Sequence, residues 1–432
     1  MPRIFTIYTG AFFASIKKRN TEMKQWGLIF LAFLLVQKQG IVLPVEADDG
    51  FITTRGVQLM LNGSPFYTNG FNAYWLMYFA TDPSKRNKVS SVFQEAKKHG
   101  LTLARTWAFN DGQDRALQTS PGNYNEQTFQ GLDFVISEAK RHGIKVVLSL
   151  VNNYEEYGGK RQYVNWARSA RQSLSSDDDF FTNSVVKGYY KNYIKAILTR
   201  RNTFTGVAYK DEPTIMAWEL MNEPRCNSDP SGRTMQAWIT EMASYLKSID
   251  SKHLLEVGLE GFYGQLSSEK QRFNPKFQVG TDFIANNQIS GIDFATVHSY
   301  PDQWLPNSDT KSQESFLSSW LKNHTEDANN ILKKPVLFAE FGKSLRTSDY
   351  IQRDKMFNTI YSAIYSSARG GGAAAGGMFW QLFTQGMDSF RDGYEVIFNE
   401  NPTTASIIAD QSQKLNKIGK MYARLRNIEK IE

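Results

Sequence analysis

The sequence predicts an α/β protein built as a single (β/α)8 (TIM) barrel, with loop insertions at the C-terminal face of its strands. From Gly50 onward, short apolar runs alternate with longer amphipathic ones, as expected for strands that alternate with helices. A repeated sequence motif gives the length of one β/α unit. Residues 96–100 (AKKHG) and 139–143 (AKRHG) lie 43 residues apart, and each precedes an apolar run. Cations followed by glycine are typical of a helix C-terminus, so each motif is a joint that connects a helix to the next strand. With 432 residues, 41% of them hydrophobic, the chain can bury the large core that such a barrel needs.

The same patterns predict where the elements lie. Strands are expected near residues 66–71, 101–107, 145–152, 215–222, 254–260, 294–300, 335–341 and 376–381. Helices are expected near residues 87–99, 126–142, 183–200, 232–249, 312–332, 349–369 and 403–427, with a short one near 280–289. Residues 370–377 (GGGAAAGG) are expected to form a flexible loop before the eighth strand. A glycine-rich phosphate loop follows none of these strands, which disfavours an open nucleotide-binding sheet.

The first 47 residues are expected to be an N-terminal extension with a secretory signal peptide, removed from a catalytic barrel domain of residues 48–432. Residues 26–36 (WGLIFLAFLLV) form an apolar run of 11 after Lys24, and small residues suited to cleavage follow at 45–47. The run is too short to span a bilayer, so we expect a secreted, extracellular or cell-wall protein without a membrane anchor after cleavage. Translation can begin at Met1 or at Met23.

Charge and cysteine content narrow the possible partners. The chain carries a net charge of +7, but residues 1–47 hold six Lys/Arg and two acids, so the remaining 44 basic and 41 acidic residues give only +3. That balance gives no support to a nucleic acid as partner. Cys226 is the only cysteine, so it cannot form a disulfide within the chain. Asn62 and Asn323 begin glycosylation sequons. We expect a monomer.

The strand expected at 215–222 ends in an acid. Residues 215–224 (IMAWELMNEP) run from apolar side chains to Asn222, Glu223 and Pro224. We expect Pro224 to hold Glu223 in extended geometry, because a residue before proline avoids the helical region. An acid at the carboxyl end of a barrel strand is where such folds place chemistry. Taken alone, Glu223 could equally be an acid at the start of a helix.

A second apolar run that ends in an acid favours the catalytic interpretation of Glu223 over a helix-start acid. Residues 335–342 (PVLFAEFG) carry Glu340 at the end of another apolar run. A carboxylate at the end of a buried run is unfavourable unless it is paired or used. Two acids on separate strands are what glycoside hydrolysis needs, because one protonates the leaving oxygen and the other attacks or stabilises the anomeric carbon.

Other polar and aromatic residues are expected to gather around the two acids, because all strand ends of a barrel meet at one mouth. They are Trp75, Arg105, Trp107, Asn152, Asn222, His298, Tyr300 and Trp380. Arg105 and Tyr300 would keep one glutamate ionised, and the glutamate away from Arg105 would be the proton donor. Asn222 could bind a sugar 2-hydroxyl, while Trp75, Trp107 and Trp380 offer faces for stacking on sugar rings. A single histidine at such a position is more often a structural residue of the core. Because His298 is expected to lie beside the two acids and Arg105, we favour a functional role for it.

These motifs resemble those of glycoside hydrolase family 5, and within it those of the plant endo-β-1,4-mannanases. The resemblance rests on residues 67–77 (YTNGFNAYWLM), 105–109 (RTWAF), 150–154 (LVNNY), 218–226 (WELMNEPRC) and 340–342 (EFG), and it covers about residues 48–428. It implies a retaining, endo-acting hydrolase of β-1,4-mannosidic bonds in cell-wall mannans, galactomannans and glucomannans, with a mechanism that also allows transglycosylation. Glu223 would be the acid/base and Glu340 the nucleophile, with mannan-type polysaccharide as substrate. The chain departs from such secreted enzymes in its long start before Met23 and in its lone cysteine.

Three alternatives remain open. A β-1,4-endoglucanase would use the same residues, because glucose and mannose differ only in the orientation of one hydroxyl group. A carbohydrate-binding protein on an inactive barrel would bind without cleaving, and a nucleic-acid binder is disfavoured by the charge. The chain has only five histidines and lacks the paired His/Asp spacing of a metal site, so we expect neither a catalytic metal nor another cofactor.

Overall fold

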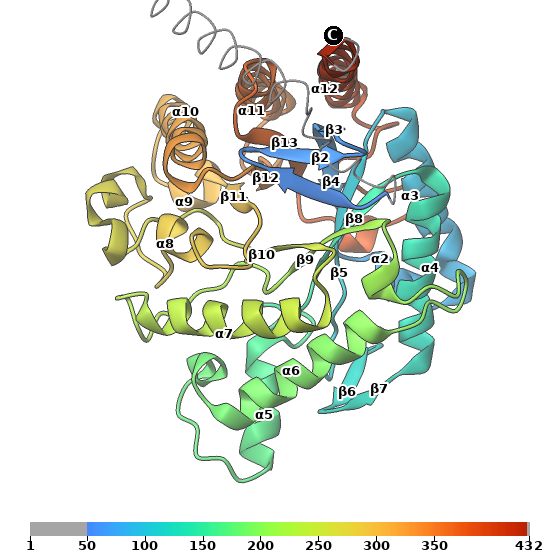
Figure 1. Ribbon diagram of the computed structural model, residues 1–432, viewed down its shortest axis with the longest axis vertical. Helices are drawn as coiled ribbons and strands as arrows, with labels where there is room; N and C mark the ends of the chain where they lie inside the picture. Colours follow the sequence, from blue (N-terminus) through green and yellow to red (C-terminus); the bar gives the residue numbers. More distant parts are fainter. Residues whose placement is uncertain (1–49, 430–432) are drawn as a thin grey trace, which may run out of the picture. The chain divides into compact units, whose positions relative to one another are not determined.

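A computed structural model of the chain describes residues 50–429 and shows a parallel barrel surrounded by helices (Figure 1). The expected signal peptide and both possible start positions lie outside the described residues. The barrel strands are β4 (Thr68–Asn72), β5 (Leu103–Trp107), β8 (Lys145–Ser149), β9 (Ile215–Glu219), β10 (Leu254–Glu256), β11 (Ala295–Ser299), β12 (Val336–Phe341) and β13 (Ala374–Phe379). All eight expected strands are therefore confirmed; seven are shorter than the run that predicted them, and β13 begins two residues earlier than expected.

The eight strands form one sheet in the order β10-β9-β8-β5-β4-β13-β12-β11, and every neighbouring pair is parallel. Backbone bonds bring its two ends together, because Asp293 N–H donates to Leu255 O at 2.8 Å and His298 N–H donates to Glu260 O at 2.9 Å. The first bond lies two residues before β11 and the second within it. The sheet thus closes into the barrel that the alternating pattern predicts.

Helices follow the strands around the outside of the barrel. They are α2 (Leu76–Ala80), α3 (Arg86–Lys98), α4 (Glu126–His142), α5 (Gly159–Ser169), α6 (Ser184–Thr199), α7 (Arg233–Ile249), α8 (Phe283–Asn287), α9 (Pro301–Trp304), α10 (Thr310–Asp327), α11 (Tyr350–Arg369) and α12 (Pro402–Glu429). The second predicted joint is confirmed in detail: Gly143 ends α4 with φ 68°, a left-handed conformation that suits glycine. At the other end of α4, the Asn125 side chain accepts bonds from Gln127 N–H and Thr128 N–H.

The expectation of a flexible loop over 370–377 is wrong for its second half. Residues 374–377 belong to β13 and are buried. A Cβ on Gly376 would lie 2.1 Å from the Thr68 carbonyl oxygen, so the glycine permits close contact between β13 and β4. The low-complexity run thus reflects tight packing of neighbouring strands rather than flexibility.

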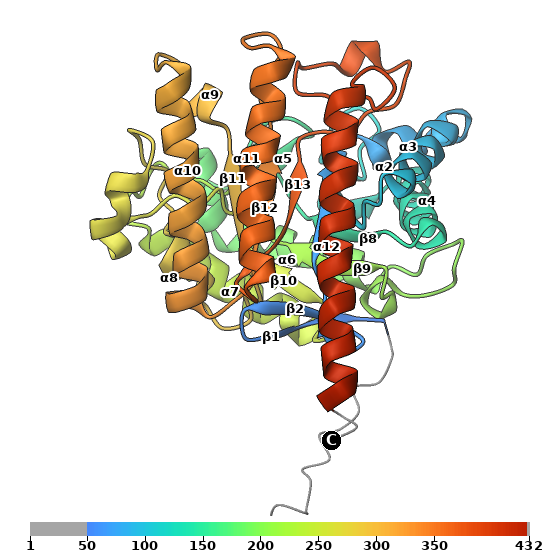
Figure 2. The same cartoon turned by 90° about the horizontal axis from the view of Figure 1, so that it is seen from above.

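Several shorter elements were not predicted. They are the antiparallel sheet β1 (Ile52–Arg55), β2 (Gln58–Leu61) and β3 (Ser64–Pro65), the hairpin β6 (Gln118–Ser120) and β7 (Asn123–Tyr124), and the helices α2, α5 and α9. Ile52 and Leu59 of the small sheet pack in one apolar cluster with side chains from inside the barrel, including Leu103, Val147 and Leu337. The sheet therefore covers the end of the barrel interior opposite the strand C-termini, as Figure 2 shows for β1 and β2.

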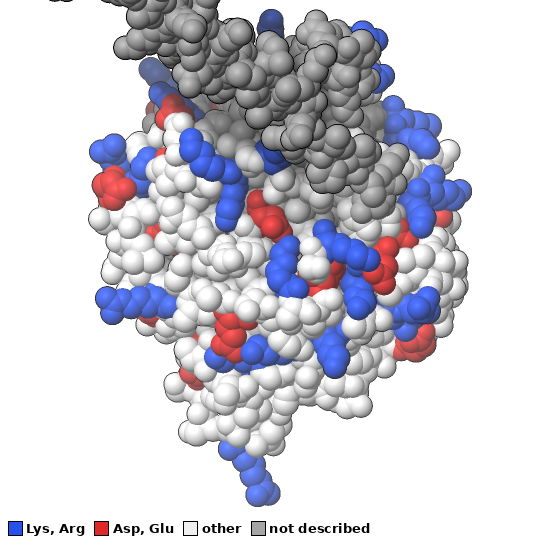
Figure 3. Space-filling view, viewed as in Figure 1, with Lys and Arg blue, Asp and Glu red and all other residues white. Residues whose placement is uncertain are grey.

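On the face drawn in Figure 3, basic side chains lie beside acidic ones at several places. Within residues 50–429, none of the helices combines the length and the apolar content that crossing a bilayer would require.

Candidate active site

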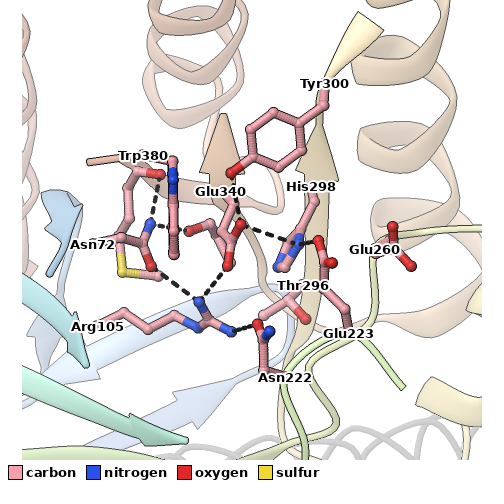
Figure 4. Close-up of polar contacts among 12 residues, drawn as sticks. Asn72, Arg105, Asn222, Glu223, Glu260, Thr296, His298, Tyr300, Glu340 and Trp380 are labelled. Atoms are coloured by element: carbon pink, nitrogen blue, oxygen red, sulfur yellow. Dashed lines mark hydrogen bonds and ion pairs between the residues drawn. The ribbon is translucent and has the colours of Figure 1, made fainter. Parts of the chain in front are cut away.

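A cleft of about 780 Å³ opens at the C-terminal ends of the barrel strands. It is lined by Tyr74, Trp107, Asn152, Tyr154, Glu156, Tyr157, Asn222, Glu223, Arg225, Glu260, Phe277, Tyr300, Gln303, Trp304, Glu340, Trp380, Asp392 and Tyr394. Both predicted acids are among these residues, together with five others from the sequence prediction. Arg105 and His298 lie fully buried just beneath the cleft and contact the two acids (Figure 4).

Glu223 lies four residues after the end of β9 at Glu219, and its backbone is not extended as we expected from Pro224. Its φ is 49°, in the left-handed region that residues with a Cβ seldom adopt. Contacts with the rest of the fold hold it there: Glu223 N–H donates to Gly258 O at 3.1 Å, and Oε1 lies 2.6 Å from His298 Nδ1. Tertiary contacts thus override the local preference imposed by proline, and such strained residues concentrate at functional sites.

Glu340 lies near the end of β12 and is held from two sides. Arg105 Nη1 donates to its Oε1, and the Tyr300 hydroxyl donates to its Oε2 at 2.7 Å. His298 Nδ1 lies 3.6 Å from the same Oε2. One side-chain oxygen of Glu223, one of Glu340 and one ring nitrogen of His298 all lie within 4.8 Å of one another. The two carboxyl groups that the sequence placed on separate strands therefore meet at one point.

A buried charge network beneath the cleft orients Arg105. Its guanidinium donates to both oxygens of Glu219, to Asn72 Oδ1 at 3.0 Å and to Asn222 Oδ1 at 2.7 Å. Asn222 in turn donates through Nδ2 to Asn152 Oδ1 at 2.9 Å. Because Arg105 is 1% exposed, these partners fix the direction of the donor that reaches Glu340. Glu219 was not predicted as a site residue, although an acid inside an apolar strand signals a buried partner.

The pKa values of the acids follow from burial and from these contacts. Burial raises the pKa of Glu223, and this rise is opposed by the Arg225 charge and the nearby Tyr154 hydroxyl. Burial also raises the pKa of Glu340, opposed by His298, Arg105 and Tyr300. The Arg105 hydrogen bonds reach Glu340 and not Glu223, but its charge lowers the pKa of both carboxyls. Because burial still raises the pKa of both acids, the expected separation of their pKa values stays a prediction. Burial lowers the pKa of His298, which favours the neutral imidazole.

Aromatic side chains form one wall of the cleft, but not all of the predicted ones. Trp107 and Trp380 line it, and Tyr74 lies between them, stacked on Trp380 with ring centres 5.8 Å apart and planes at 12°. Trp75 does not face the cleft, which contradicts its predicted role in stacking on sugar. It is 0% exposed, and its indole N–H donates to Leu382 O at 3.2 Å. The neighbouring Tyr74 occupies the position that we assigned to Trp75.

Other cleft residues escaped the sequence prediction, among them Tyr154, Arg225, Glu260 and Asp392. Arg225 donates to both carboxylate oxygens of Glu260, at 2.8 and 2.6 Å. Burial and the nearby Glu223 raise the pKa of Glu260 to about 7. Arg225 directly follows Pro224 in the sequence, so its place beside Glu223 could have been predicted. Glu260 ends the apolar run that predicted a strand over 254–260, so the signal that marked Glu223 and Glu340 could have found it; the structure places it in a loop after β10.

Glu223, His298 and Glu340 also satisfy the spacing of a three-ligand metal site. The Arg105 guanidinium bonded to Glu340 supplies a positive charge where a cation would bind, so the environment opposes a divalent ion. The arrangement suits acid and nucleophile chemistry better. Two carboxyl groups about 5 Å apart can serve as proton donor and nucleophile at one anomeric carbon, the spacing typical of retaining glycosidases.

Comparisons with known proteins agree with this geometry. A family model described as GH family 5 beta-mannosidase-like matches residues 49–391. The chain is 63% identical over 383 residues to mannan endo-1,4-beta-mannosidase 7 of Arabidopsis thaliana, covering 88% of this chain and 89% of that protein. It is 60% identical over 385 residues to mannan endo-1,4-beta-mannosidase 1 of Oryza sativa subsp. japonica, covering 88% and 89%. The crystal structure of the endo-1,4-beta-mannanase from Rhizomucor miehei superposes with a TM-score of 0.71 at 34% identity, covering 85% of this chain and 99% of that one. The chain belongs to glycoside hydrolase family 5, in its beta-mannosidase-like group.

Proposed function

We propose that this protein is an endo-acting, retaining hydrolase of internal β-1,4-mannosidic bonds in mannan-type polysaccharides. The observation that carries the proposal is the meeting of Glu223 and Glu340, whose side-chain oxygens lie within 4.8 Å of each other in an open cleft. The named relatives, which are mannan endo-1,4-beta-mannosidases, support mannan as the substrate class. An open cleft lined by aromatic rings suits the interior of a polymer chain rather than its end.

In this proposal Glu340 attacks the anomeric carbon of the bound mannose while Glu223 protonates the departing glycosidic oxygen. Arg105 and Tyr300 hold the Glu340 oxygens by hydrogen bonds, so the nucleophile is already oriented before the substrate arrives. In the second step Glu223, now ionised, removes a proton from water, and the water cleaves the glycosyl-enzyme bond. A sugar hydroxyl in place of water would give transglycosylation. Asn222 lies beside both acids and could bind the 2-hydroxyl, a contact that strengthens in the transition state.

The first test is Glu340→Ala in parallel with Glu155→Gln as a matched control. Glu155 is exposed in a loop at the same end of the barrel but does not line the cleft. Loss of the nucleophile should reduce the rate on galactomannan by on the order of 10⁴-fold or more, with unchanged circular dichroism. The control should remain active. Retained hydrolysis in the Glu340 variant would refute its role.

Substrate and stereochemistry need a second experiment. Release of reducing sugar from galactomannan but not from carboxymethylcellulose would distinguish a mannanase from a β-1,4-endoglucanase. NMR of the first product should show the β-anomer, because two displacements at one carbon retain configuration. Binding of mannan without cleavage would instead support the inactive-barrel alternative.

We also propose that the protein is secreted to the cell wall after removal of residues 1–47 and acts as a monomer. The apolar run at 26–36 supports this proposal, as does the cell-wall origin of mannan substrates. Expression with a C-terminal tag, followed by N-terminal sequencing of protein from the medium, tests it. A mature N-terminus well away from residue 48, or retention inside cells, would contradict it.

A further inference from the structure

A second groove lies on the outer wall of the barrel, between α11 and α12. Figure 2 shows these two helices side by side, and the groove between them has a volume of about 170 Å³. The residues that line it include Ser362, Tyr365, Ser366, Asp410, Gln411 and Lys414. None of these residues lines the catalytic cleft, so the groove is a separate feature of the surface.

The floor of this groove contains an unsatisfied hydrogen-bond donor. Gln411 is 3% exposed, and its Nε2 has no hydrogen-bond partner among residues 50–429. A buried amide N–H without an acceptor is unfavourable, so such a group is normally satisfied by water or by a ligand. Because this nitrogen is itself buried, a ligand in the groove reaches it only if the Gln411 side chain moves.

The walls combine one aromatic ring with small polar side chains and balanced charges. Tyr365 is half-buried, so part of its ring remains accessible. Asp410 and Lys414 form an ion pair of 2.6 Å, and Lys414 Nζ lies 5.9 Å from the centre of the Tyr365 ring. Because the two charges offset each other, the groove has no preference for an ionic ligand. An aromatic face, an amide and serine hydroxyls are instead suited to a neutral sugar ring.

A larger groove of about 450 Å³ lies on the other side of α11, against α10. The two grooves share Ser366 as a lining residue, so they adjoin across α11. A sugar held beside Tyr365 could therefore continue along the surface as part of a longer chain. This arrangement favours a polymer over a free monosaccharide.

We propose that the groove between α11 and α12 is a non-catalytic binding site for a segment of the β-1,4-mannan chain, with Tyr365 stacked on a sugar ring. This inference rests on the proposed mannan-hydrolase function. Such a site holds the enzyme on a polysaccharide surface while the cleft, on a different part of the barrel, cleaves another segment. Its contribution is largest for insoluble polymer and absent for oligosaccharides too short to occupy both sites.

The test compares Tyr365→Ala with Phe204→Ala, a control that removes another exposed ring, 48% exposed and outside both grooves. Initial rates are measured on soluble mannotetraose and on insoluble mannan. Tyr365→Ala should match the parent on mannotetraose but act more slowly on insoluble mannan, and Phe204→Ala should match the parent on both. Equal losses on both substrates would show that Tyr365 acts through the fold and would overturn the proposal. A parent enzyme that fails to cleave mannotetraose and mannan would refute the proposed function instead.

Binding is measured separately by retardation in native gels containing galactomannan. A Glu340→Gln, Trp380→Ala background prevents cleavage and weakens binding in the cleft, so the remaining retardation reports the outer groove. Adding Tyr365→Ala should weaken this binding about three- to tenfold, the effect of losing one stacked ring. Ser362→Arg, at an exposed position on the groove wall, should weaken it as well by blocking access. Unchanged retardation in both variants would overturn the proposal.

Discussion

His298 Nδ1 lies 2.6 Å from Glu223 Oε1, so a buried imidazole contacts the carboxyl group that we propose as the proton donor. The same nitrogen lies 3.6 Å from Glu340 Oε2. Burial lowers the pKa of His298, and a neutral ring with Nδ1 between two acids can hydrogen-bond to one of them without adding a full positive charge. His298 therefore helps to hold the two acids at their separation.

Replacing His298 should consequently impair the chemical step more than substrate binding. We expect His298→Asn to lower kcat by about 10²-fold, with a smaller change in KM, because the proton donor loses its orienting partner. His142→Asn, at the C-terminal end of α4 and away from the cleft, is the control. Steady-state kinetics on a mannan oligosaccharide measure the effect, and an unchanged kcat would contradict this role.

Tyr154 should set the alkaline limit of activity. Its hydroxyl stabilises ionised Glu223 and lowers the pKa of that carboxyl, against the raising effect of burial. Removing the hydroxyl in Tyr154→Phe should raise the pKa of Glu223, so the proton donor keeps its proton to higher pH. The alkaline limb of the kcat/KM profile should then move to higher pH, while Tyr157→Phe, also in the cleft, should leave it in place. A shift to lower pH would contradict the assignment of Glu223.

Much of this site follows from patterns that are visible in the sequence. Glu223 and Glu340 end apolar runs, and the barrel topology requires the ends of such runs to meet, so their proximity could be predicted without coordinates. The choice between Tyr74 and Trp75 could not be predicted in this way. Both residues follow the end of β4 at Asn72, where strand alternation no longer decides which side chain faces the cleft. Glu260 is a different case, since it ends the apolar run predicted as a strand over 254–260 and was missed although it carries the same signal as Glu223 and Glu340.

Asp392 should control substrate binding through Trp380. Its Oδ2 accepts bonds from Trp380 Nε1 at 3.2 Å and from Gln381 Nε2 at 2.9 Å, so it fixes the plane of the indole ring in the cleft. Asp392→Ala should free that ring and raise KM severalfold, equivalent to about 1 kcal/mol, with a smaller effect on kcat. Asp388→Ala, at an exposed neighbouring position outside the cleft, is the control. Equal kinetics for the two variants would contradict the role of Asp392.

Removing metal ions should leave the activity unchanged. Glu223, His298 and Glu340 have the spacing of a metal site, but Arg105 already donates to Glu340 and opposes a second cation there. We therefore expect the same initial rate on galactomannan before and after dialysis against EDTA, measured in metal-free buffer. Loss of activity that is restored by a divalent ion would show that the three residues hold a required metal.

Asp111 should destabilise the fold at neutral pH, although it lies outside the cleft. It is 0% exposed, its Oδ2 has no hydrogen-bond partner among residues 50–429, and burial raises its pKa well above the usual value. A carboxyl with a raised pKa in the folded state binds its proton more tightly there than in the unfolded chain. Its stabilising effect is therefore complete below the unfolded pKa of about 4 and is lost as pH rises above it.

Asp111→Asn should remove this pH dependence, because the amide keeps an acceptor for Gln118 Nε2 and cannot ionise. We expect the variant to gain about 1 kcal/mol or more in unfolding free energy relative to the parent at pH 7, and little at pH 4. Asp133→Asn is the opposite control: Asp133 is equally buried but is paired with Arg200 at 2.8 Å, so its neutralisation should destabilise the fold by about 3 kcal/mol. Urea unfolding followed by tryptophan fluorescence at the two pH values measures both effects. A loss of stability in Asp111→Asn at pH 7 would show that the ionised carboxylate has a stabilising partner.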